Sequence, residues 1–301
     1  MPGPAENAYN LRMIKGTITA LVTPFTERGD LDLEATERLV ESQIAGGVEG
    51  LVVLGTTGES PAISDGERKT LLASVQEMVK DRCLLVAGTG TNNTVKSISQ
   101  TRDALDIGYR FALVVTPYYN KPTQQGLYEH FSMVASEVPG AGIIVYNVPG
   151  RTGVNINPDT VIKLAQAQKN IVAVKEASGN LDQVNALVRS GIPVLSGDDA
   201  LTLPMMSIGA VGVISVASNP APGLMSDMVR AALDGDFVKA RELHGKLYPL
   251  FRVLFLETSP GPVKAALAEM GICGSTLRPP LAAISPATLE ELKKALKETG
   301  C

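Results

Sequence analysis

A lysine at the end of an apolar run is the residue of this sequence with the clearest potential for chemistry. Residues Ile171 to Val174 are typical of a buried strand, and Lys175 follows them directly in the run IVAVKEASG. A lysine with the ordinary pKa of about 10.4 is only roughly 0.1% neutral near pH 7.4. Burial can lower this pKa by about 3 units, which makes Lys175 a candidate Schiff-base nucleophile. The alternative is a rim lysine whose head reaches water or pairs with Glu176.

Two further candidates lie in or just after the apolar run GIIVYN, which begins at Gly142 and precedes the lysine-bearing run. Tyr146 lies in this run, and a phenol beside the amine can relay protons while a carbinolamine forms and loses water. Taken alone, Tyr146 is equally well interpreted as a rim tyrosine with a buried ring and a solvated hydroxyl. Arg151, in the motif PGRTG, is either an ordinary loop arginine or a bidentate clamp for a substrate carboxylate.

Hydroxyl groups gather in two loops of the sequence. The turn GTTG from Gly55 carries Thr56 and Thr57, whose hydroxyls and backbone amides can hold a small carboxylate. Many strand-to-helix turns look like this one, so the turn alone is a weak signal. The tyrosine pair that ends at Tyr119 lies between prolines and can equally serve packing or subunit contact. The run GTGTNN from Gly88 does not complete a nucleotide-binding fingerprint.

Eight short apolar runs, separated by amphipathic segments, must position these residues. Most of the runs are continuously apolar, which is typical of parallel strands buried on both faces. Helix-start signals fall between them, including a capping box from Ser64 to Glu67 and capping residues at Asn157 and Asn180. Eight strand-then-helix units predict a (β/α)8 TIM barrel, ahead of an open doubly wound sheet. The runs begin at Thr17, Gly50, Leu84, Ala112, Gly142, Ile171, Pro193 and Val211.

The last part of the chain predicts a C-terminal helical extension packed on the barrel. Its segments LDGDFVKARELHGKLYPLF, SPGPVKAALAEMG and SPATLEELKKALKE space their apolar residues three and four apart. We therefore expect a catalytic barrel over residues 15–235 and a helical region over residues 236–301, with a loose tail at residues 1–14. Active sites of such barrels lie at the carboxyl ends of the strands, which is where the candidate residues fall.

The composition excludes several classes of function. A chain of 301 residues with 45% hydrophobic and 19% charged residues and a net charge of -4 is an ordinary globular protein, not a nucleic-acid binder. Three cysteines without a CxxC pair and two histidines predict neither a disulfide framework nor a metal site. Because no secretory signal and no apolar run of roughly 18 residues is present, we expect no membrane contact and a cytoplasmic location.

Taken in chain order, several motifs resemble those of the dihydrodipicolinate synthase family, a branch of the pyruvate-dependent class I aldolases. Each motif is weak alone, and the set is specific. The resemblance implies that Lys175 forms an imine with pyruvate, while Thr56, Tyr146 and Tyr119 form a proton relay. Tyr119 would reach in from a neighbouring subunit. The motifs are GTTGES, TPYYNKP, YNVPGRTG, VKEASG, SGDDA and GVISV.

The resemblance also implies the substrates and the assembly. Thr57 and the Thr56 amide would hold the pyruvate carboxylate, and Arg151 would receive the carboxylate of L-aspartate-4-semialdehyde. The backbones of Gly197 and Ile214 would line the site. The implied reaction gives 4-hydroxy-tetrahydrodipicolinate, in lysine and diaminopimelate biosynthesis. It needs no metal or organic cofactor, since the imine is the electron sink, and it implies a homotetramer built from tight dimers.

Two alternative functions stay open. An N-acetylneuraminate lyase or a 2-keto-3-deoxy sugar acid aldolase of the same superfamily would share Lys175 and Tyr146. Arg151 and Tyr119 argue against this alternative, because sugar-acid members generally differ at both positions. The alternative of another class is an inactive barrel that binds a metabolite or acts as a scaffold, and the joint presence of the reactive residues argues against it.

One departure from the family pattern concerns regulation. Family members that lysine inhibits carry acidic and other polar side chains in a dimer-interface pocket near Tyr118. In this sequence Lys96 stands where an acidic partner for the ammonium of the lysine effector is expected. Because Lys96 would repel that cation, we predict weak or absent feedback inhibition by lysine.

Overall fold

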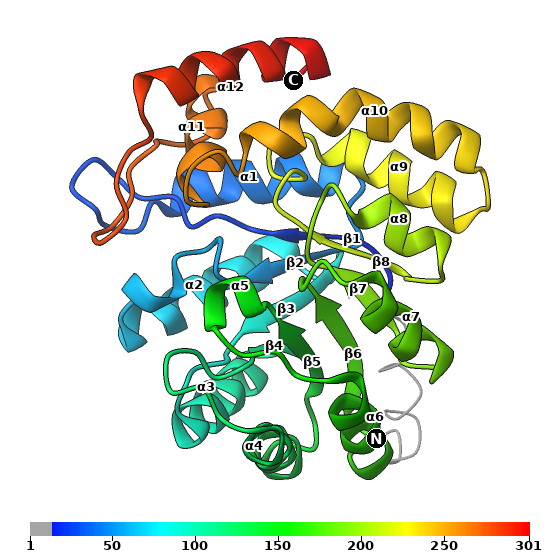
Figure 1. The fold of residues 1–301 in the computed structure, drawn as a ribbon. Helices are drawn as coiled ribbons and strands as arrows, with labels where there is room; N and C mark the ends of the chain where they lie inside the picture. Colours follow the sequence, from blue (N-terminus) through cyan, green and yellow to red (C-terminus); the bar gives the residue numbers. More distant parts are fainter. Residues whose placement is uncertain (1–13) are drawn as a thin grey trace.

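The structure, a computed structural model that describes residues 14–301, contains a closed barrel of eight parallel strands (Figure 1). Each strand pairs with the next one along the chain, and the last strand pairs with the first. This arrangement confirms the predicted (β/α)8 TIM barrel. The strands are β1 (Gly16–Ala20), β2 (Gly50–Val53), β3 (Leu84–Gly88), β4 (Phe111–Val115), β5 (Gly142–Asn147), β6 (Ile171–Glu176), β7 (Val194–Ser196) and β8 (Gly212–Ser215).

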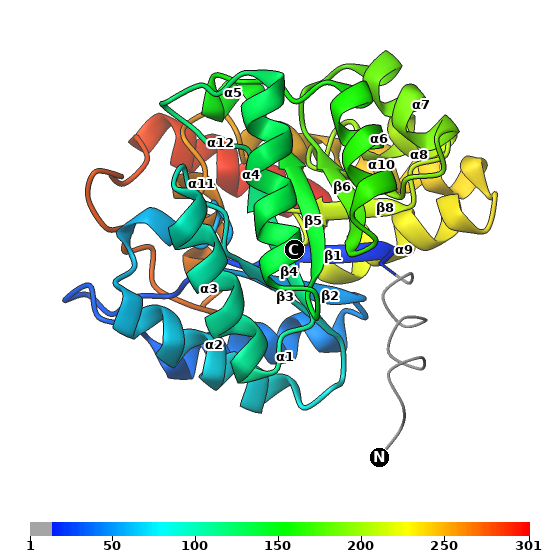
Figure 2. The same cartoon turned by 90° about the horizontal axis from the view of Figure 1, so that it is seen from below.

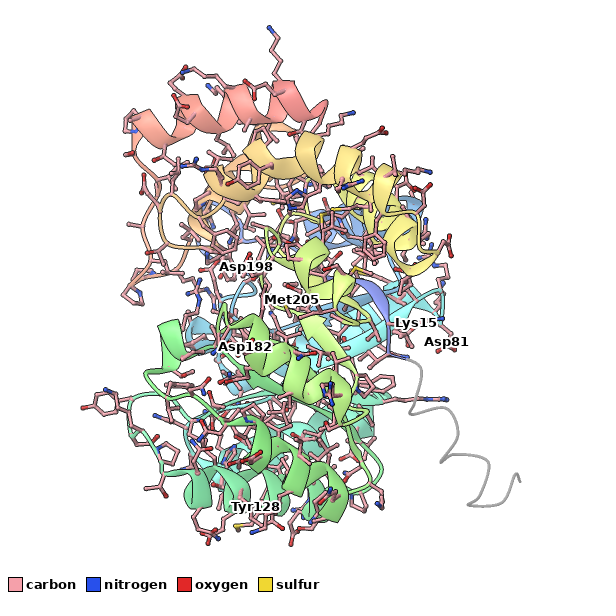
Figure 3. All side chains as sticks on the ribbon, turned by 45° about the vertical axis from the view of Figure 1, so that its right-hand side comes forward. Lys15, Asp81, Tyr128, Asp182, Asp198 and Met205 are labelled. Atoms are coloured by element: carbon pink, nitrogen blue, oxygen red, sulfur yellow. The ribbon has the colours of Figure 1, made fainter. Side chains whose placement is uncertain are left out.

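A ring of helices surrounds the barrel, as the view from below shows (Figure 2), and side chains fill the space between the layers (Figure 3). The strands are apolar along nearly their whole length because one face meets the barrel interior and the other meets the helices. The helices that follow the strands are α1 (Leu33–Ala45), α2 (Asp65–Val79), α3 (Thr94–Ile107), α4 (Gln124–Glu137), α6 (Pro158–Ala167), α7 (Leu181–Arg189), α8 (Thr202–Ser207) and α9 (Pro222–Leu233). Two short elements precede α2 and α6, namely the 3-10 helix η2 (Ser60–Ala62) and α5 (Pro149–Thr152).

Local capping explains where several of these helices begin. The Ser64 side chain and the Glu67 carboxylate form the predicted capping box at the start of α2. The Asn180 side chain accepts hydrogen bonds from two backbone amides in the first turn of α7. Asn157 precedes the proline that opens α6, but its side chain makes no capping hydrogen bond. The helix start at that position therefore depends on the proline ring and on packing.

Three helices follow the barrel and lie together on one side of it, beside α1 and α9 (Figure 1). They are α10 (Phe237–Val253), α11 (Gly261–Glu269) and α12 (Pro286–Thr299), in agreement with the predicted helical extension. The division of the chain at residues 235 and 236 stays a prediction. The predicted tail lies outside the described residues apart from Ile14, which is buried. Over residues 14–301, no helix has both the length and the apolar character needed to cross a membrane.

Candidate active site

The carboxyl ends of β5 and β6 bring Lys175 and Tyr146 together. The register of the two strands places these residues directly opposite each other. The Nζ atom of Lys175 lies 4.3 Å from the centre of the Tyr146 ring. Both side chains are 6% exposed, although they occupy the end of the barrel that opens to solvent. The amine and the phenol are therefore close enough to handle the same proton through one bound molecule.

Strand alternation sends the next pair of residues to the other side of the sheet. The Glu176 carboxylate accepts hydrogen bonds from Nδ2 of Asn147 at 3.1 Å, from Nε2 of Gln183 at 2.8 Å and from the Ser178 amide at 2.7 Å. Among the described residues, Glu176 thus has amide partners and forms no ion pair with Lys175. This network ties the end of β6 to α7 and fixes the strand from which Lys175 projects into the barrel.

Electrostatics favour the neutral amine at Lys175. Burial is the main cause, and together with the Arg151 cation it lowers the pKa of Lys175 to about 7, while the carboxyl of Asp199 acts in the opposite direction. A lysine with this pKa is about half neutral near pH 7, whereas an ordinary lysine is almost fully charged. The sequence-based argument that burial would activate this amine therefore agrees with the geometry.

Tyr146 is suited to give a proton and not to hold a charge. Burial raises the pKa of Tyr146, and the Arg151 cation and a hydrogen bond with Thr56 oppose the rise only in part. The phenol therefore stays protonated at neutral pH. Thr56, in the turn after β2, lines the same cavity as Tyr146.

A cavity of about 190 Å³ surrounds these groups. A cavity of this size suits a substrate of a few heavy atoms, because drug-sized ligands occupy about 300–1,000 Å³. Six of the predicted site residues line it, and the structure brings them together from five loops and strand ends: Thr56, Thr57, Tyr146, Arg151, Lys175 and Gly197. Ile214 is not among the lining residues. It lies within β8 and is 1% exposed, and Val216 lines the cavity in its place.

Gly197 has a steric role that the sequence does not reveal. A Cβ atom at this position would lie 3.0 Å from Cε of Lys175 and 2.8 Å from Cβ of Ala177. A Cβ atom essentially never comes as close as the 2.8 Å to Ala177, and the 3.0 Å to Lys175 would require the lysine side chain to shift, so a glycine leaves both neighbours in place. Gly197 therefore shapes the path of Lys175 through the barrel mouth.

Tyr119 does not reach the cavity within one chain. Its side chain is 88% exposed, and its backbone has a φ of +73°, a conformation that non-glycine residues seldom adopt. The neighbouring Tyr118 lines a second cavity of about 440 Å³, to which Lys96 also contributes. The two cavities share Thr56, Tyr146 and Arg151 as lining residues, among others, so the Tyr119 loop borders the region next to the site.

The structure adds residues that the sequence argument did not single out. Asp199 is 2% exposed, and its Oδ2 atom accepts hydrogen bonds from the amides of Val216 at 3.1 Å and Ala217 at 2.9 Å. Burial is the main cause that raises the pKa of Asp199 to about 6. From the C-terminal region, Phe255 and Ser259 line the cavity. The two adjacent aspartates of SGDDA, directly after a strand, were a sequence signal for Asp199. The apolar spacing of the C-terminal segments gave no signal for Phe255 or Ser259.

The catalytic cavity holds a lysine, a tyrosine, hydroxyls and an arginine. Over residues 14–301, no three histidine, cysteine, aspartate or glutamate side chains gather as metal ligands would. The groups that are present can form an imine, relay protons and bind carboxylates. This set of groups is the one that class I aldolase chemistry needs.

Comparison with known proteins agrees with this chemistry. Residues 13–299 match the profile of the dihydrodipicolinate synthetase family. A 4-hydroxy-tetrahydrodipicolinate synthase of Thermotoga neapolitana is 49% identical over 294 residues, which cover 96% of this chain and 99% of the relative. The enzyme of the same name from Aquifex aeolicus is 47% identical over 289 residues, and this match covers 95% of this chain and 98% of that enzyme.

Solved structures give the same result. The crystal structure of dihydrodipicolinate synthase from Aquifex aeolicus is similar with a TM-score of 0.93 and 46% identity, covering 95% of this chain and 98% of that one. The 4-hydroxy-tetrahydrodipicolinate synthase of Methylacidiphilum fumariolicum gives a TM-score of 0.93 at 48% identity, with 95% and 96% of the two chains covered. Family profile, relatives and fold coincide over nearly the whole chain, and the protein belongs to the dihydrodipicolinate synthetase family.

Proposed function

We propose that this protein is a 4-hydroxy-tetrahydrodipicolinate synthase that condenses pyruvate with L-aspartate-4-semialdehyde through a Schiff base on Lys175. The observation that carries the proposal is the buried amine of Lys175, which lies 4.3 Å from the Tyr146 ring centre. Relatives of this name at 47–49% identity support the assignment of the reaction. The same chemistry places the protein in the biosynthesis of lysine and diaminopimelate.

The first half of the reaction joins pyruvate to the enzyme. The neutral Nζ atom of Lys175 attacks the carbonyl carbon of pyruvate and gives a carbinolamine. The Tyr146 phenol, which burial keeps protonated, gives its proton to the hydroxyl that leaves as water. Thr57 and the Thr56 amide hold the pyruvate carboxylate in a nest of donors. Loss of a proton from the methyl group of the imine then gives an enamine.

The second half forms the carbon–carbon bond. The enamine carbon attacks the aldehyde of L-aspartate-4-semialdehyde, while Arg151 binds the carboxylate of this substrate in bidentate fashion. The amine of the bound product then displaces Lys175 by transimination and closes the six-membered ring. In this proposal Gly197 forms part of the wall of the site, and Val216 lines it where Ile214 was expected. Lys175 leaves the reaction as a free amine, and the proposed reaction needs no metal or organic cofactor because the imine itself is the electron sink.

We further propose that Tyr119 completes the relay of a neighbouring subunit. An exposed tyrosine on a backbone with a φ of +73° gains no packing that would offset its strained conformation within one chain. A second copy that accepts this phenol would supply the missing contact. The proposed assembly is a homotetramer of two tight dimers, and the proposed location is the cytoplasm.

The alternative reactions find less support. Lys175 and Tyr146 would equally serve a sugar-acid aldolase, but Arg151 lines the cavity where a second carboxylate can bind. The relatives reported above carry the synthase name. An inactive barrel would not need a lysine whose pKa burial lowers to about 7, because an unpaired buried amine costs stability.

Borohydride trapping followed by a coupled assay tests the proposal. We expect pyruvate and borohydride to leave a stable adduct on Lys175, and L-aspartate-4-semialdehyde to turn over in the absence of borohydride. An adduct without turnover of this aldehyde would refute the assigned substrate and keep the imine chemistry. The absence of any adduct would refute the whole mechanism.

A further inference from the structure

A second buried lysine lies outside the residues that the reaction uses. Lys264 of α11 and Glu59, in the segment that follows β2, form an ion pair in which Nζ and Oε1 are 2.7 Å apart and both side chains are 0% exposed. The Lys264 ammonium also donates a hydrogen bond of 2.9 Å to the Thr23 carbonyl and lies 4.2 Å from the centre of the Phe25 ring. These three contacts of the ammonium are made with the loops after β1 and β2.

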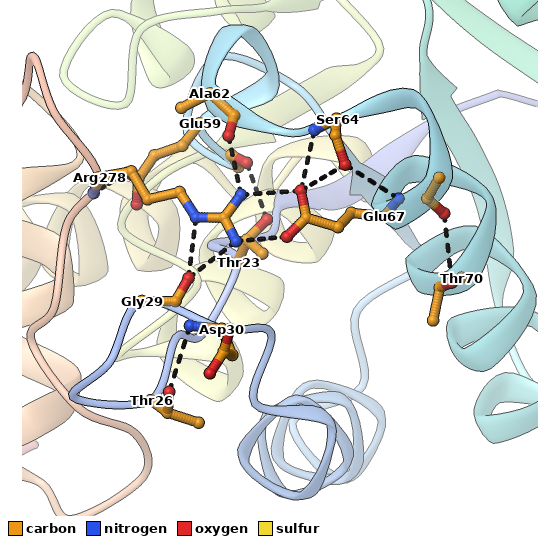
Figure 4. Close-up of polar contacts among 12 residues, drawn as sticks. Thr23, Thr26, Gly29, Asp30, Glu59, Ala62, Ser64, Glu67, Thr70 and Arg278 are labelled. Carbon is orange, nitrogen blue, oxygen red and sulfur yellow. Dashed lines mark hydrogen bonds and ion pairs between the residues drawn. The ribbon is translucent and has the colours of Figure 1, made fainter.

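The other oxygen of Glu59 is bound by the same C-terminal region. The Arg278 amide donates a hydrogen bond of 3.0 Å to Oε2 of Glu59. The guanidinium of Arg278 donates to the carbonyls of Gly29 and Ala62 and to the carboxylate of Glu67, as Figure 4 shows. Two cationic residues from one region therefore hold the segment that leads from β2 to α2.

This segment is the continuation of the turn that carries Thr56 and Thr57. The Glu59 amide donates a hydrogen bond of 3.1 Å to the Thr56 carbonyl, and Glu59 has a left-handed backbone with a φ of +53°. The Thr23 hydroxyl donates a hydrogen bond of 2.8 Å to the carbonyl of Gly58. Lys264 thus reaches the turn by two routes, through the Glu59 carboxylate and through Thr23.

A buried ion pair is a poor way to gain stability, because desolvation of both charges offsets most of their attraction. It is an effective way to fix a position, because only one geometry satisfies both charges. The pair joins residues 205 positions apart in the sequence. Its location directly behind a carboxylate-binding turn points to a role in positioning that turn.

We infer that Lys264 is a positioning residue, through which the C-terminal helical region holds Thr56 and Thr57 in place for the carboxylate of pyruvate. The inference depends on the proposed function, since it assigns pyruvate to this turn. Lys264 itself touches no substrate. The aldehyde half of the site, with Arg151 on α5, is held by other elements and does not depend on the ion pair.

Steady-state kinetics of three variants test the inference: Lys264→Met, Glu59→Gln and the double variant that carries both changes. We expect the KM for pyruvate to rise about 10- to 100-fold in each, since a misplacement of about 1 Å can cost an enzyme as much as about 100-fold. The KM for L-aspartate-4-semialdehyde should change much less. Borohydride trapping at saturating pyruvate should still label Lys175.

Two control variants separate positioning from stability. Leu164→Ala removes a fully buried side chain from α6, a helix that packs against α4 and α7, and should lower the unfolding temperature while the KM for pyruvate stays at the wild-type value. Lys293→Met breaks an exposed ion pair with Glu269 and should change neither quantity.

The double variant is decisive. It leaves no unpaired buried charge, so we expect its unfolding temperature to recover towards that of the wild type while its KM for pyruvate stays raised. Recovery of both quantities would overturn the inference, because the pair would then serve stability alone. If wild-type protein forms no pyruvate adduct, the proposed function fails; if it forms one and the variants keep the wild-type KM, only the inference about Lys264 fails.

Discussion

Over residues 14–301 two lysines are buried, Lys175 in the barrel and Lys264 in α11 beside it, and different partners surround the two ammonium groups. Lys264 is paired with Glu59 at 2.7 Å and bonded to a backbone carbonyl. Lys175, which is 6% exposed, has the Tyr146 ring beside it. Burial lowers the pKa of both lysines, and Glu59 opposes the effect directly at Lys264. The comparison shows that burial of a lysine does not by itself identify a nucleophile; the pairing of its charge decides.

The largest effect should come from removing the unpaired lysine. Lys175→Met should abolish trapping of pyruvate and lower kcat/KM by more than about 10³-fold, as loss of a covalent nucleophile does in other enzymes. Lys264→Met should still give the adduct at saturating pyruvate. Mass spectrometry of borohydride-treated protein measures both outcomes. An adduct on Lys264, or one that persists in Lys175→Met, would reverse the roles assigned to the two lysines.

The free energy of unfolding should fall more in Lys264→Met than in Lys175→Met, the reverse of the order expected for activity. Lys264→Met leaves the Glu59 carboxylate buried without its partner and should lower the free energy of unfolding by about 3–5 kcal/mol. Lys175→Met replaces an unpaired amine by an apolar chain of similar volume and should change it by less than about 1.5 kcal/mol. Denaturant unfolding at one fixed protein concentration compares them, because the proposed homotetramer would make the free energy of unfolding depend on concentration. Equal losses would contradict the comparison.

Gly197→Ala tests whether the path of Lys175 matters as much as its charge. The added methyl group would meet Cε of Lys175 at 3.0 Å and should lower kcat/KM about 10- to 100-fold with the fold retained. Gly223→Ala is the matched control, because a Cβ atom there has nothing within 4 Å. Unchanged kinetics in Gly197→Ala, measured at saturating L-aspartate-4-semialdehyde, would show that the lysine has room to move.

The pH dependence of imine formation should report the lowered pKa of Lys175. The ammonium loses its proton as pH rises through about 7, so the trapping rate should rise over this range and level off above it. Below this value the rate should fall about tenfold per pH unit, because only the neutral amine attacks. Rapid-quench trapping from about pH 5 to about pH 11 covers both a midpoint near 7 and the ordinary pKa of a lysine. A midpoint near pH 10 would mean that the amine is not desolvated.

Free lysine should have the smallest effect. Lys96 lines the second cavity, and its Nζ atom lies 3.6 Å from Oδ1 of Asp65 in an exposed ion pair. A cation in this position opposes binding of another ammonium, so millimolar lysine should leave activity almost unchanged. Inhibition in the sub-millimolar range would contradict this prediction, and Lys96→Glu, assayed in parallel, should increase any sensitivity that exists.

Much of the fold was predictable because its signals are local. Continuous apolar runs mark doubly buried strands, and the capping box at Ser64 marks the start of a helix, whatever the rest of the chain does. Lys175 and Tyr146 were predictable as neighbours because consecutive strands of a barrel pair in sequence. Their own local patterns, in contrast, left rim positions equally open, and the set of motifs decided between the readings.

The parts that escaped prediction depend on contacts between distant segments. The spacing of apolar residues does not predict that Ser259 lines the cavity or that Lys264 pairs with Glu59. Apolar periodicity predicts which face of a helix is buried, but not which segment packs against that face. An ion pair of Lys175 with Glu176 was an open alternative because the two residues are adjacent in the sequence and carry opposite charges. Pleating separates them, and the amide network around Glu176 confirms that separation. Tyr119 lies outside the cavity of its own chain, and its role in a neighbouring subunit stays a prediction.

The burial of Lys175 also has a consequence for the chain before it folds. On a ribosome or in an unfolded chain this side chain is an ordinary solvated ammonium, inert towards the carbonyl metabolites around it. The strands beside it span residues 142–196, and the barrel closes only when β8, which ends at Ser215, pairs with β1. Nucleophilicity therefore appears with closure of the barrel, at the moment when the groups that select pyruvate are in place, and a chain that unfolds loses its reactivity in the same step.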